Sequence, residues 1–104
     1  MMKVITLANK RGRTMVDDRD FPNVEEYSWQ KHSQGYATRS KKVPGTQEVI
    51  HILLHRVIAG VQDVETGEIL KPGARVRHRS ANKLDNRRKN LLVTYPDGRK
   101  NSVL

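Results

Sequence analysis

One stretch of this chain, residues 75–101, carries side chains that could together act on a phosphodiester. It contains one imidazole, His78, followed by a loop rich in asparagine, arginine and lysine. An imidazole can take a proton from water near neutral pH, and amide or carboxylate oxygens can hold a hard divalent cation. Arginine and lysine neutralise backbone phosphates. These residue types in one short segment favour a nucleic acid as the ligand or substrate.

The distribution of charge also points to a polyanionic partner. The chain of 104 residues has 20 Lys and Arg against 11 Asp and Glu, a net charge of +9. Residues 71–104 hold ten of these cations and two of the acids, whereas residues 1–70 hold ten cations and nine acids. Because the positive field surrounds His78, a polyanion is the expected partner, and the candidates are DNA, RNA and an acidic protein.

Composition excludes several other classes of site. The chain has no cysteine, which excludes disulfides, thiol catalysis and cysteine-ligated zinc. No run approaches the ~20 apolar residues that span a bilayer, and the basic segment lacks the apolar face of a membrane-surface helix. The N-terminus has no apolar segment of the secretion-signal type. We therefore expect a cytoplasmic protein without a membrane partner and without zinc.

The elements that must position the basic stretch are short. Alternating and β-branched residues predict strands at 3–7, 13–16, 27–32, 36–39, 75–78 and 91–93. Apolar residues that recur with a 3.6-residue period predict a helix over 46–60, with Gly60 as its C-terminal stop. The expected organisation is one compact α+β unit. A strand and helix subdomain covers 1–73, and the basic motif covers 74–104.

The basic stretch resembles a known family. His78, the run Asn82-Lys-Leu-Asp-Asn-Arg-Arg and Asn90-Leu91 resemble the core of the HNH endonucleases, in particular the small homing type encoded by phages and introns. Upstream, Leu54-His55-Arg56-Val57-Ile58 resembles the helix that precedes this core in the same group. The resemblance implies an N-terminal twisted antiparallel sheet and one helix, followed by a ββα nuclease motif over 74–104.

The resemblance also implies a role for individual residues. His78 is the expected general base that activates a water molecule, and Asn90 is the expected brace of the loop behind it. One Mg²⁺ or Mn²⁺ ion is expected at the scissile phosphate, with Asn101 or Asp97 as its ligand. The helix that precedes the motif is expected to support the site through His55 and Arg56.

Basic residues near this motif are expected to hold the nucleic-acid backbone. Such contacts position a protein on its target without specifying a sequence. The candidates are Arg39, Lys41, Lys42, Arg75, Arg77, Arg79, Lys83, Arg87, Arg88 and Lys89.

One residue departs from the family pattern. Arg77 precedes His78, where active members of the group usually carry a metal-binding aspartate, and an arginine repels a cation. Three interpretations stay open: Asn101 and DNA phosphates hold the metal alone, Asp85 or Asp97 supplies the missing ligand, or the chain binds without cutting.

The residues and the resemblance together predict a metal-dependent HNH-type endonuclease that nicks or cuts double-stranded DNA. The resemblance places it in a phage-infected bacterial cell. The first alternative is a catalytically inactive nucleic-acid-binding protein on the same fold. The second is a basic phage protein that binds a host protein or a ribonucleoprotein. In all three readings the basic segment is the binding surface.

Overall fold

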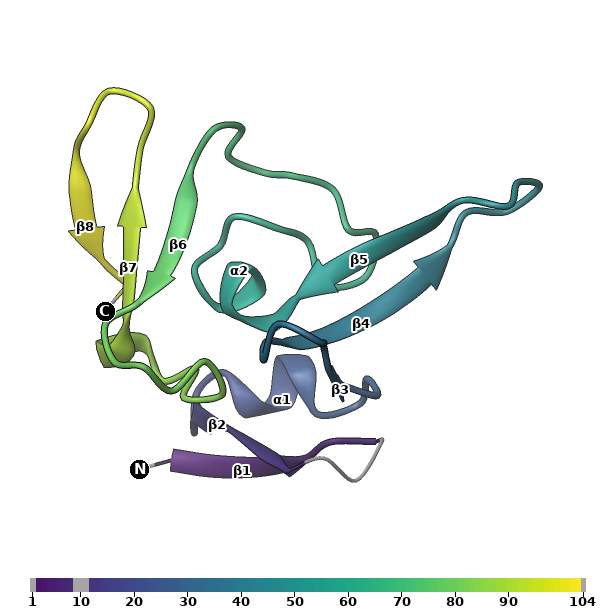
Figure 1. Ribbon diagram of the computed structural model, residues 1–104, viewed down its shortest axis with the longest axis horizontal. Coiled ribbons are helices and arrows are strands. Elements are labelled where there is room, and N and C mark those ends of the chain that lie inside the picture. The colour runs from purple at the N-terminus through teal and green to yellow at the C-terminus, as the bar shows by residue number, and fades with distance from the viewer. Residues whose placement is uncertain (1, 9–11, 104) are drawn as a thin grey trace.

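The computed structural model describes residues 2–8 and 12–103, with the backbone alone at Ser102. Within these residues the chain is a small α+β fold in which short helices accompany three antiparallel sheets (Figure 1). Its elements in chain order are β1 (Met2–Thr6), β2 (Arg13–Asp17), α1 (Phe21–Val24), β3 (Gln30–Lys31), β4 (Ala37–Lys42), β5 (Val49–Leu53), α2 (Leu54–Ile58), β6 (Arg75–His78), the 3-10 helix η1 (Arg88–Asn90), β7 (Leu91–Thr94) and β8 (Lys100–Ser102).

The N-terminal hairpin is joined to the basic segment by main-chain hydrogen bonds. β1 and β2 pair as their alternating residues predict, and β2 also contacts the loop between β6 and β7. Met15 N donates to Leu84 O at 2.9 Å, and Asn86 N donates to Met15 O at 2.8 Å. These bonds hold the N-terminal hairpin against the loop between β6 and β7, where the first and third sheets approach one another.

The second sheet carries the centre of the core. β3, β4 and β5 are antiparallel neighbours, and the β4–β5 hairpin projects away from the body of the molecule (Figure 1). Trp29 is fully buried beside this sheet with Ile52 and Leu54, and its Nε1 donates to Val24 O at 2.8 Å. The expected single N-terminal sheet is thus two sheets, β1–β2 and β3–β4–β5.

The predicted helix over 46–60 is wrong in its first half. Residues 49–53 form β5, and the helical part is α2, Leu54–Ile58. Val49, Ile50 and Ile52 are β-branched, and this restricts their side chains and favours a strand. Pairing with β4 outweighs the helical period, because the apolar positions satisfy both patterns over so short a run.

Among the described residues the expected ββα motif is not confirmed, because the element that follows β7 is a strand. β6 and β7 pair as expected, but residues 100–102 are β8, which pairs with β7. Tyr95 N donates to Arg99 O and Gly98 N donates to Tyr95 O, both at 2.9 Å, so the intervening turn reverses the chain. Gly98 has φ +89°, a conformation that glycine adopts without strain. This reversal places the following residues beside β7 in a third sheet.

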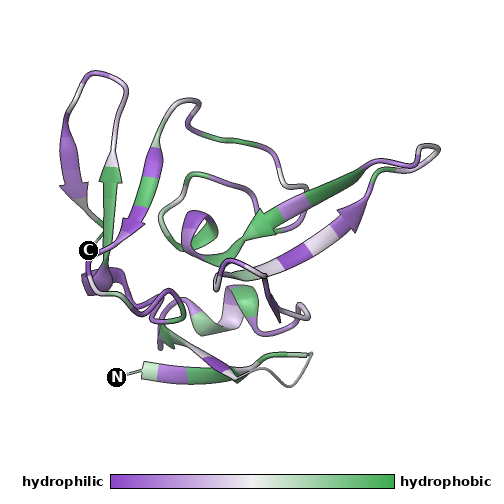
Figure 2. Cartoon of the chain, viewed as in Figure 1, coloured by the Kyte–Doolittle hydropathy of each residue, from purple (hydrophilic) through white to green (hydrophobic). Residues whose placement is uncertain are grey.

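Polar residues dominate the hairpin tips and loops, whereas apolar residues gather in β5 and β7 and in the centre of the fold (Figure 2). In β6 the two kinds alternate along the strand (Figure 2). The helices of the described residues are all too short or too polar to traverse a lipid bilayer.

Candidate functional site

His78 ends β6 and is held by a chain of side-chain hydrogen bonds from the N-terminal hairpin. Its Nε2 lies 2.8 Å from Asn86 Oδ1. The Asn86 amide nitrogen donates to Thr14 Oγ1 at 2.8 Å, and the Thr14 hydroxyl donates to Leu84 O at 2.8 Å. Asn86 and Thr14 are fully buried, so water cannot replace these bonds.

This chain of bonds fixes which ring nitrogen of His78 carries the proton. A carbonyl oxygen only accepts, so the Thr14 proton points to Leu84 and the Thr14 oxygen accepts from Asn86. The Asn86 carbonyl oxygen then faces His78, and Nε2 must donate to it. In the neutral imidazole Nδ1 therefore carries the free lone pair and is the nitrogen available to a bound molecule.

The hydrogen-bonded side chains of Thr14, Asn86 and His78 form a relay, and three aromatic rings meet beside it. His55 of α2 stacks on Tyr36 with ring centroids 4.9 Å apart, and its centroid is 5.0 Å from that of His78. The pKa of His55 is lowered to about 3, chiefly by burial and to a lesser extent by the nearby His78 and Arg56. Burial also lowers the pKa of His78, against the opposing effect of the Asn86 hydrogen bond. Both imidazoles are therefore neutral at pH 7.

Asn90 closes the loop that follows His78. Its side-chain amide nitrogen donates to Asp85 O at 2.9 Å, and its Oδ1 accepts from Ser80 N at 3.0 Å. The side chain is buried and thus joins the two sides of the loop between β6 and β7. This bridge limits the movement of the backbone on which His78 sits.

The expected metal ligand Asn101 lies on β8, on the far side of β7 from His78. The register pairs His78 of β6 with Leu91 of β7, and Val93 of β7 with Asn101 of β8. Asn101 is therefore two strands away from His78 and displaced from it by two residues along the strand direction. At ordinary strand spacings their Cα atoms are about 12 Å apart. Asn101 is exposed there, at the edge of the third sheet.

The carboxylates that could replace the missing ligand are occupied by arginine. Asp97 lies in the exposed turn before β8 and pairs with Arg99, with Oδ2 and Nε 2.6 Å apart. Asp85 accepts two hydrogen bonds from Arg87, at 2.8 and 2.7 Å, and this pairing lowers the pKa of Asp85. Within residues 2–8 and 12–103, no group of three or more His, Asp or Glu side chains could hold a metal ion.

A cleft of about 640 Å³ lies between β6 and the β3–β4–β5 sheet. Arg75 and Arg77 of β6 form one wall, and Arg56 of α2 also lines the cleft. The opposite wall contains the exposed rings of His32 and His51. A smaller hollow of about 220 Å³ adjoins it and is lined in part by His78 and Lys83. None of the described residues that line either hollow is an acid, so the donor set suits an anion and does not fit the expected divalent cation.

The ten candidate phosphate contacts differ in how much of their charge is available. Arg87 and Arg88 are paired with carboxylates, and the side chains of Arg39, Lys41 and Lys83 bond to main-chain oxygens. Arg75 and Arg77 face the cleft. The exposed residues Lys42, Arg79 and Lys89 lie outside its lining.

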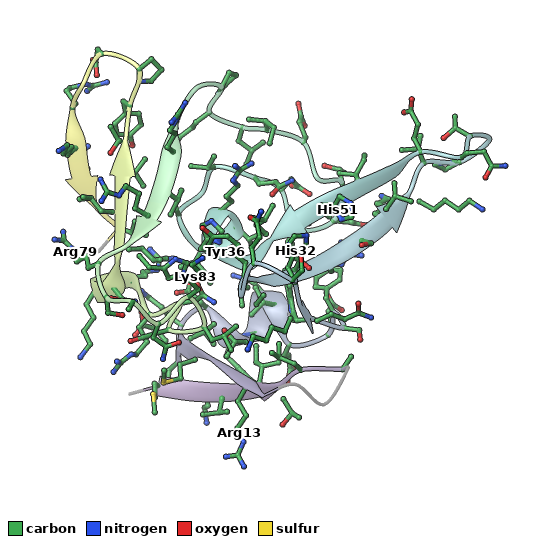
Figure 3. All side chains as sticks on the ribbon, viewed as in Figure 1. Arg13, His32, Tyr36, His51, Arg79 and Lys83 are labelled. Atoms are coloured by element: carbon green, nitrogen blue, oxygen red, sulfur yellow. The ribbon has the colours of Figure 1, made fainter. Side chains whose placement is uncertain are left out.

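Sequence reasoning missed residues that only the fold brings together. Thr14 and Asn86 are 72 residues apart and form the relay behind His78. Tyr36 lines both hollows, and Figure 3 shows it between Lys83 and His32 in this view. The alternation in the strands places side chains on faces, but no sequence signal indicated which faces would meet.

Comparisons of the chain with protein-family models, with curated proteins and with solved structures gave no match.

Proposed function

We propose that this protein binds the phosphodiester backbone of a nucleic acid in the cleft between β6 and the β3–β4–β5 sheet. One observation carries the proposal: three arginines, Arg56, Arg75 and Arg77, line this cleft, and no carboxylate is among its described lining residues. Guanidinium groups suit phosphate because they are always charged and present donors in a planar fork.

The availability of these guanidinium groups supports an external anion as their partner. Among the described residues, the carboxylates that bind arginine pair with Arg87, Arg88 and Arg99, away from the cleft. Arg75 and Arg77 have no such partner in that part of the chain. Cations gathered between low-dielectric walls attract a polyanion more strongly than the same charges spread over the surface.

The test is the affinity for a fluorescent oligonucleotide, measured by anisotropy as salt is raised. The Arg75→Gln/Arg77→Gln variant should bind at least about tenfold more weakly than wild type, because charged hydrogen bonds are lost. The slope of log affinity against log salt should become shallower by roughly 0.7–0.9 for each lost phosphate contact.

The matched control is Arg13→Gln. Arg13 is an exposed arginine of β2 that lies on a different side of the molecule from His32 and His51 (Figure 3). Its removal should leave affinity and slope nearly unchanged. Equal losses for the two variants would mean that net charge, and not the cleft, determines binding.

A second candidate function, phosphodiester hydrolysis, is favoured by the free Nδ1 of His78. The proposed base would take a proton from an attacking water at a phosphate held beside Arg77 and Lys83, which share the smaller hollow. Arg77 supplies positive charge at the position where the HNH resemblance implies a metal-binding aspartate. No step is assigned to a metal, since the donor set does not fit one.

Nicking of supercoiled plasmid distinguishes binding from hydrolysis. The reactions would contain Mg²⁺, Mn²⁺ or EDTA, and would compare wild type, His78→Ala and the control Arg13→Gln, which lies outside both hollows. Nicking that His78→Ala abolishes and Arg13→Gln retains would establish hydrolysis by the proposed base. Retained binding without nicking in any condition would leave the protein as a binding module alone.

A further inference from the structure

The shape of the cleft narrows the class of nucleic acid. We infer that it takes an unpaired segment of a single strand in preference to an intact duplex. This inference rests on the proposed function and names the ligand of that same site.

The size of the cleft is the first observation. Its volume of about 640 Å³ equals that of a sphere roughly 11 Å across, in the range of pockets that hold small organic ligands. A DNA duplex has grooves about 8 Å deep on both sides of its axis, so it is at least roughly 16 Å wide. A duplex could touch only the rim, whereas one or two unpaired nucleotides could enter and reach Arg56 on α2.

One wall of the cleft carries positive charge and the other carries imidazole rings, a combination that suits the phosphates and the bases of a single strand. Arg75 and Arg77 supply charge on the β6 wall. On the opposite wall the exposed rings of His32 and His51 lie edge to face, with centroids 6.5 Å apart (Figure 3). Proteins that bind single strands combine a cationic groove with rings on which bases stack, and histidine serves as such a ring.

The histidine rings, and not Tyr36, are the available stacking surface. One face of Tyr36 is stacked on His55, and the ammonium group of Lys83 lies 4.7 Å from its ring centroid. His32 is oriented by its own turn, because its Nδ1 accepts a hydrogen bond from Gln34 N at 3.2 Å. A base that enters the cleft therefore meets an oriented imidazole on the wall opposite the arginines.

The edge of the third sheet adds a second kind of contact. β6 pairs with β7 on one side only, because the strand order is β6-β7-β8. An edge strand presents unpaired N–H and C=O groups, which can bond to the base edges of an unpaired nucleotide. In a duplex the Watson–Crick edges are already paired and cannot make these bonds.

The test compares three labelled oligonucleotides of one sequence, each about 12 nucleotides long: single-stranded DNA, single-stranded RNA and duplex DNA. Wild-type protein should bind at least one single-stranded form about tenfold more tightly than the duplex. Binding of both single strands alike, or of RNA alone through its 2′-hydroxyls, would each support the inference.

Two variants show whether the expected walls are responsible. His32→Ala/His51→Ala should weaken single-strand binding by about fivefold or more, with a smaller effect on the duplex, because stacking is lost. Arg13→Gln is the control for both ligands. All proteins would be checked for native circular dichroism.

Each result that contradicts these expectations rejects a different claim. Duplex binding as tight as, or tighter than, single-strand binding would overturn the inference and leave the proposed function intact. Failure of all three oligonucleotides to bind would overturn the proposed function as well. Single-strand binding that is unchanged in His32→Ala/His51→Ala would reject the stacking wall.

Discussion

At the scale of single residues, the chemical character of His78 depends on its neighbours. The relay through Asn86 to Thr14 determines that Nε2 carries the proton, so Nδ1 is the basic nitrogen. Burial lowers the pKa of His78, so its imidazole is neutral at pH 7. A neutral ring with a fixed tautomer can serve as a hydrogen-bond acceptor or as a base without first losing a proton.

Replacing Asn86 with alanine should reduce both the stability of the protein and the pKa of His78. The variant removes the acceptor of the partly buried His78 Nε2. It also removes the donor to the buried Thr14 Oγ1, which keeps only its bond to Leu84 O, and we expect a cost of about 2–3 kcal/mol in the free energy of unfolding. The pKa of His78 should fall, because the Asn86 bond favours the charged form. Urea denaturation and an NMR titration of His78 measure the two effects.

Asn101→Ala is the matched control for this amide. Asn101 is exposed on β8, so its replacement should change neither the free energy of unfolding nor the pKa of His78 measurably. An Asn86→Ala protein with wild-type stability and an unchanged His78 titration would mean that the relay does not form in solution.

His55 should make stability depend on pH in a defined window. Burial lowers its pKa from 6.5 to about 3, so the unfolded chain binds a proton between these values while the folded chain does not. This contribution is fully present above pH 6.5 and is lost as the pH falls toward 3, by up to about 1.4 kcal/mol per pH unit. His78, with its lowered pKa, acts in the same direction.

The measurement is urea denaturation of wild type and His55→Gln between pH 7 and pH 4. Glutamine does not titrate, so the difference in unfolding free energy between the two proteins isolates His55 from the carboxylates. The wild type should lose more stability than the variant as the pH falls. Parallel curves would show that His55 gains its proton as easily in the folded protein as in the unfolded chain.

At the scale of elements, the site depends on how the N-terminal region holds η1 and the loop before it. Asp20, at the start of α1, accepts two hydrogen bonds from Arg88, at 2.9 and 2.7 Å. Asp17 at the end of β2 accepts from Arg88 N at 2.9 Å. Arginine of the basic segment thus stabilises the fold here, a role that the count of positive charges did not indicate.

Arg88→Gln should destabilise the protein, because it leaves the buried Asp20 carboxylate without its ion pair. Since Arg88 is partly exposed, we expect a loss of about 1–3 kcal/mol, below the full cost of breaking a buried pair. Arg99→Gln, which breaks the exposed pair with Asp97, should cause no measurable loss. Equal effects in chemical denaturation would contradict this assignment of the Arg88 pair.

The sequence predicted β1, β2, β6 and β7, but it did not predict that residues 49–53 and 100–102 form the strands β5 and β8. Alternation and turn residues suffice for β1, β2, β6 and β7, because each pairs with a near neighbour in the chain. The helix over 46–60 failed because Val49, Ile50 and Ile52 fit a strand as well as a helical face. Whether such a short segment forms a strand or a helix is determined by the strand that pairs with it.

The same limit applies to the candidate site. His78, Arg75 and Arg77 were identified from residue type and position, because one short strand carries all three. His32 and His51 were not, because they come from separate segments and meet only when β3, β4 and β5 pair. Contacts between sheets depend on packing that no local pattern encodes.

At the scale of the whole molecule, the arrangement of charge matters more than its total. The sequence gathers an excess of cations in residues 71–104, but Arg87, Arg88 and Arg99 pair with carboxylates. The cations that face the cleft come from both of these regions, with Arg56 from residues 1–70 and Arg75 and Arg77 from residues 71–104. We therefore expect anions to bind at one localised surface, and not non-specifically over the whole molecule.

The most direct test of this central claim is an NMR titration of the ¹⁵N-labelled protein with a single-stranded oligonucleotide. The account predicts that amide shifts cluster at β6, α2, His32 and His51, the segments around the cleft. Shifts confined to the projecting β4–β5 tip or to the face that carries Arg13, with the amides of β6 unmoved, would contradict it.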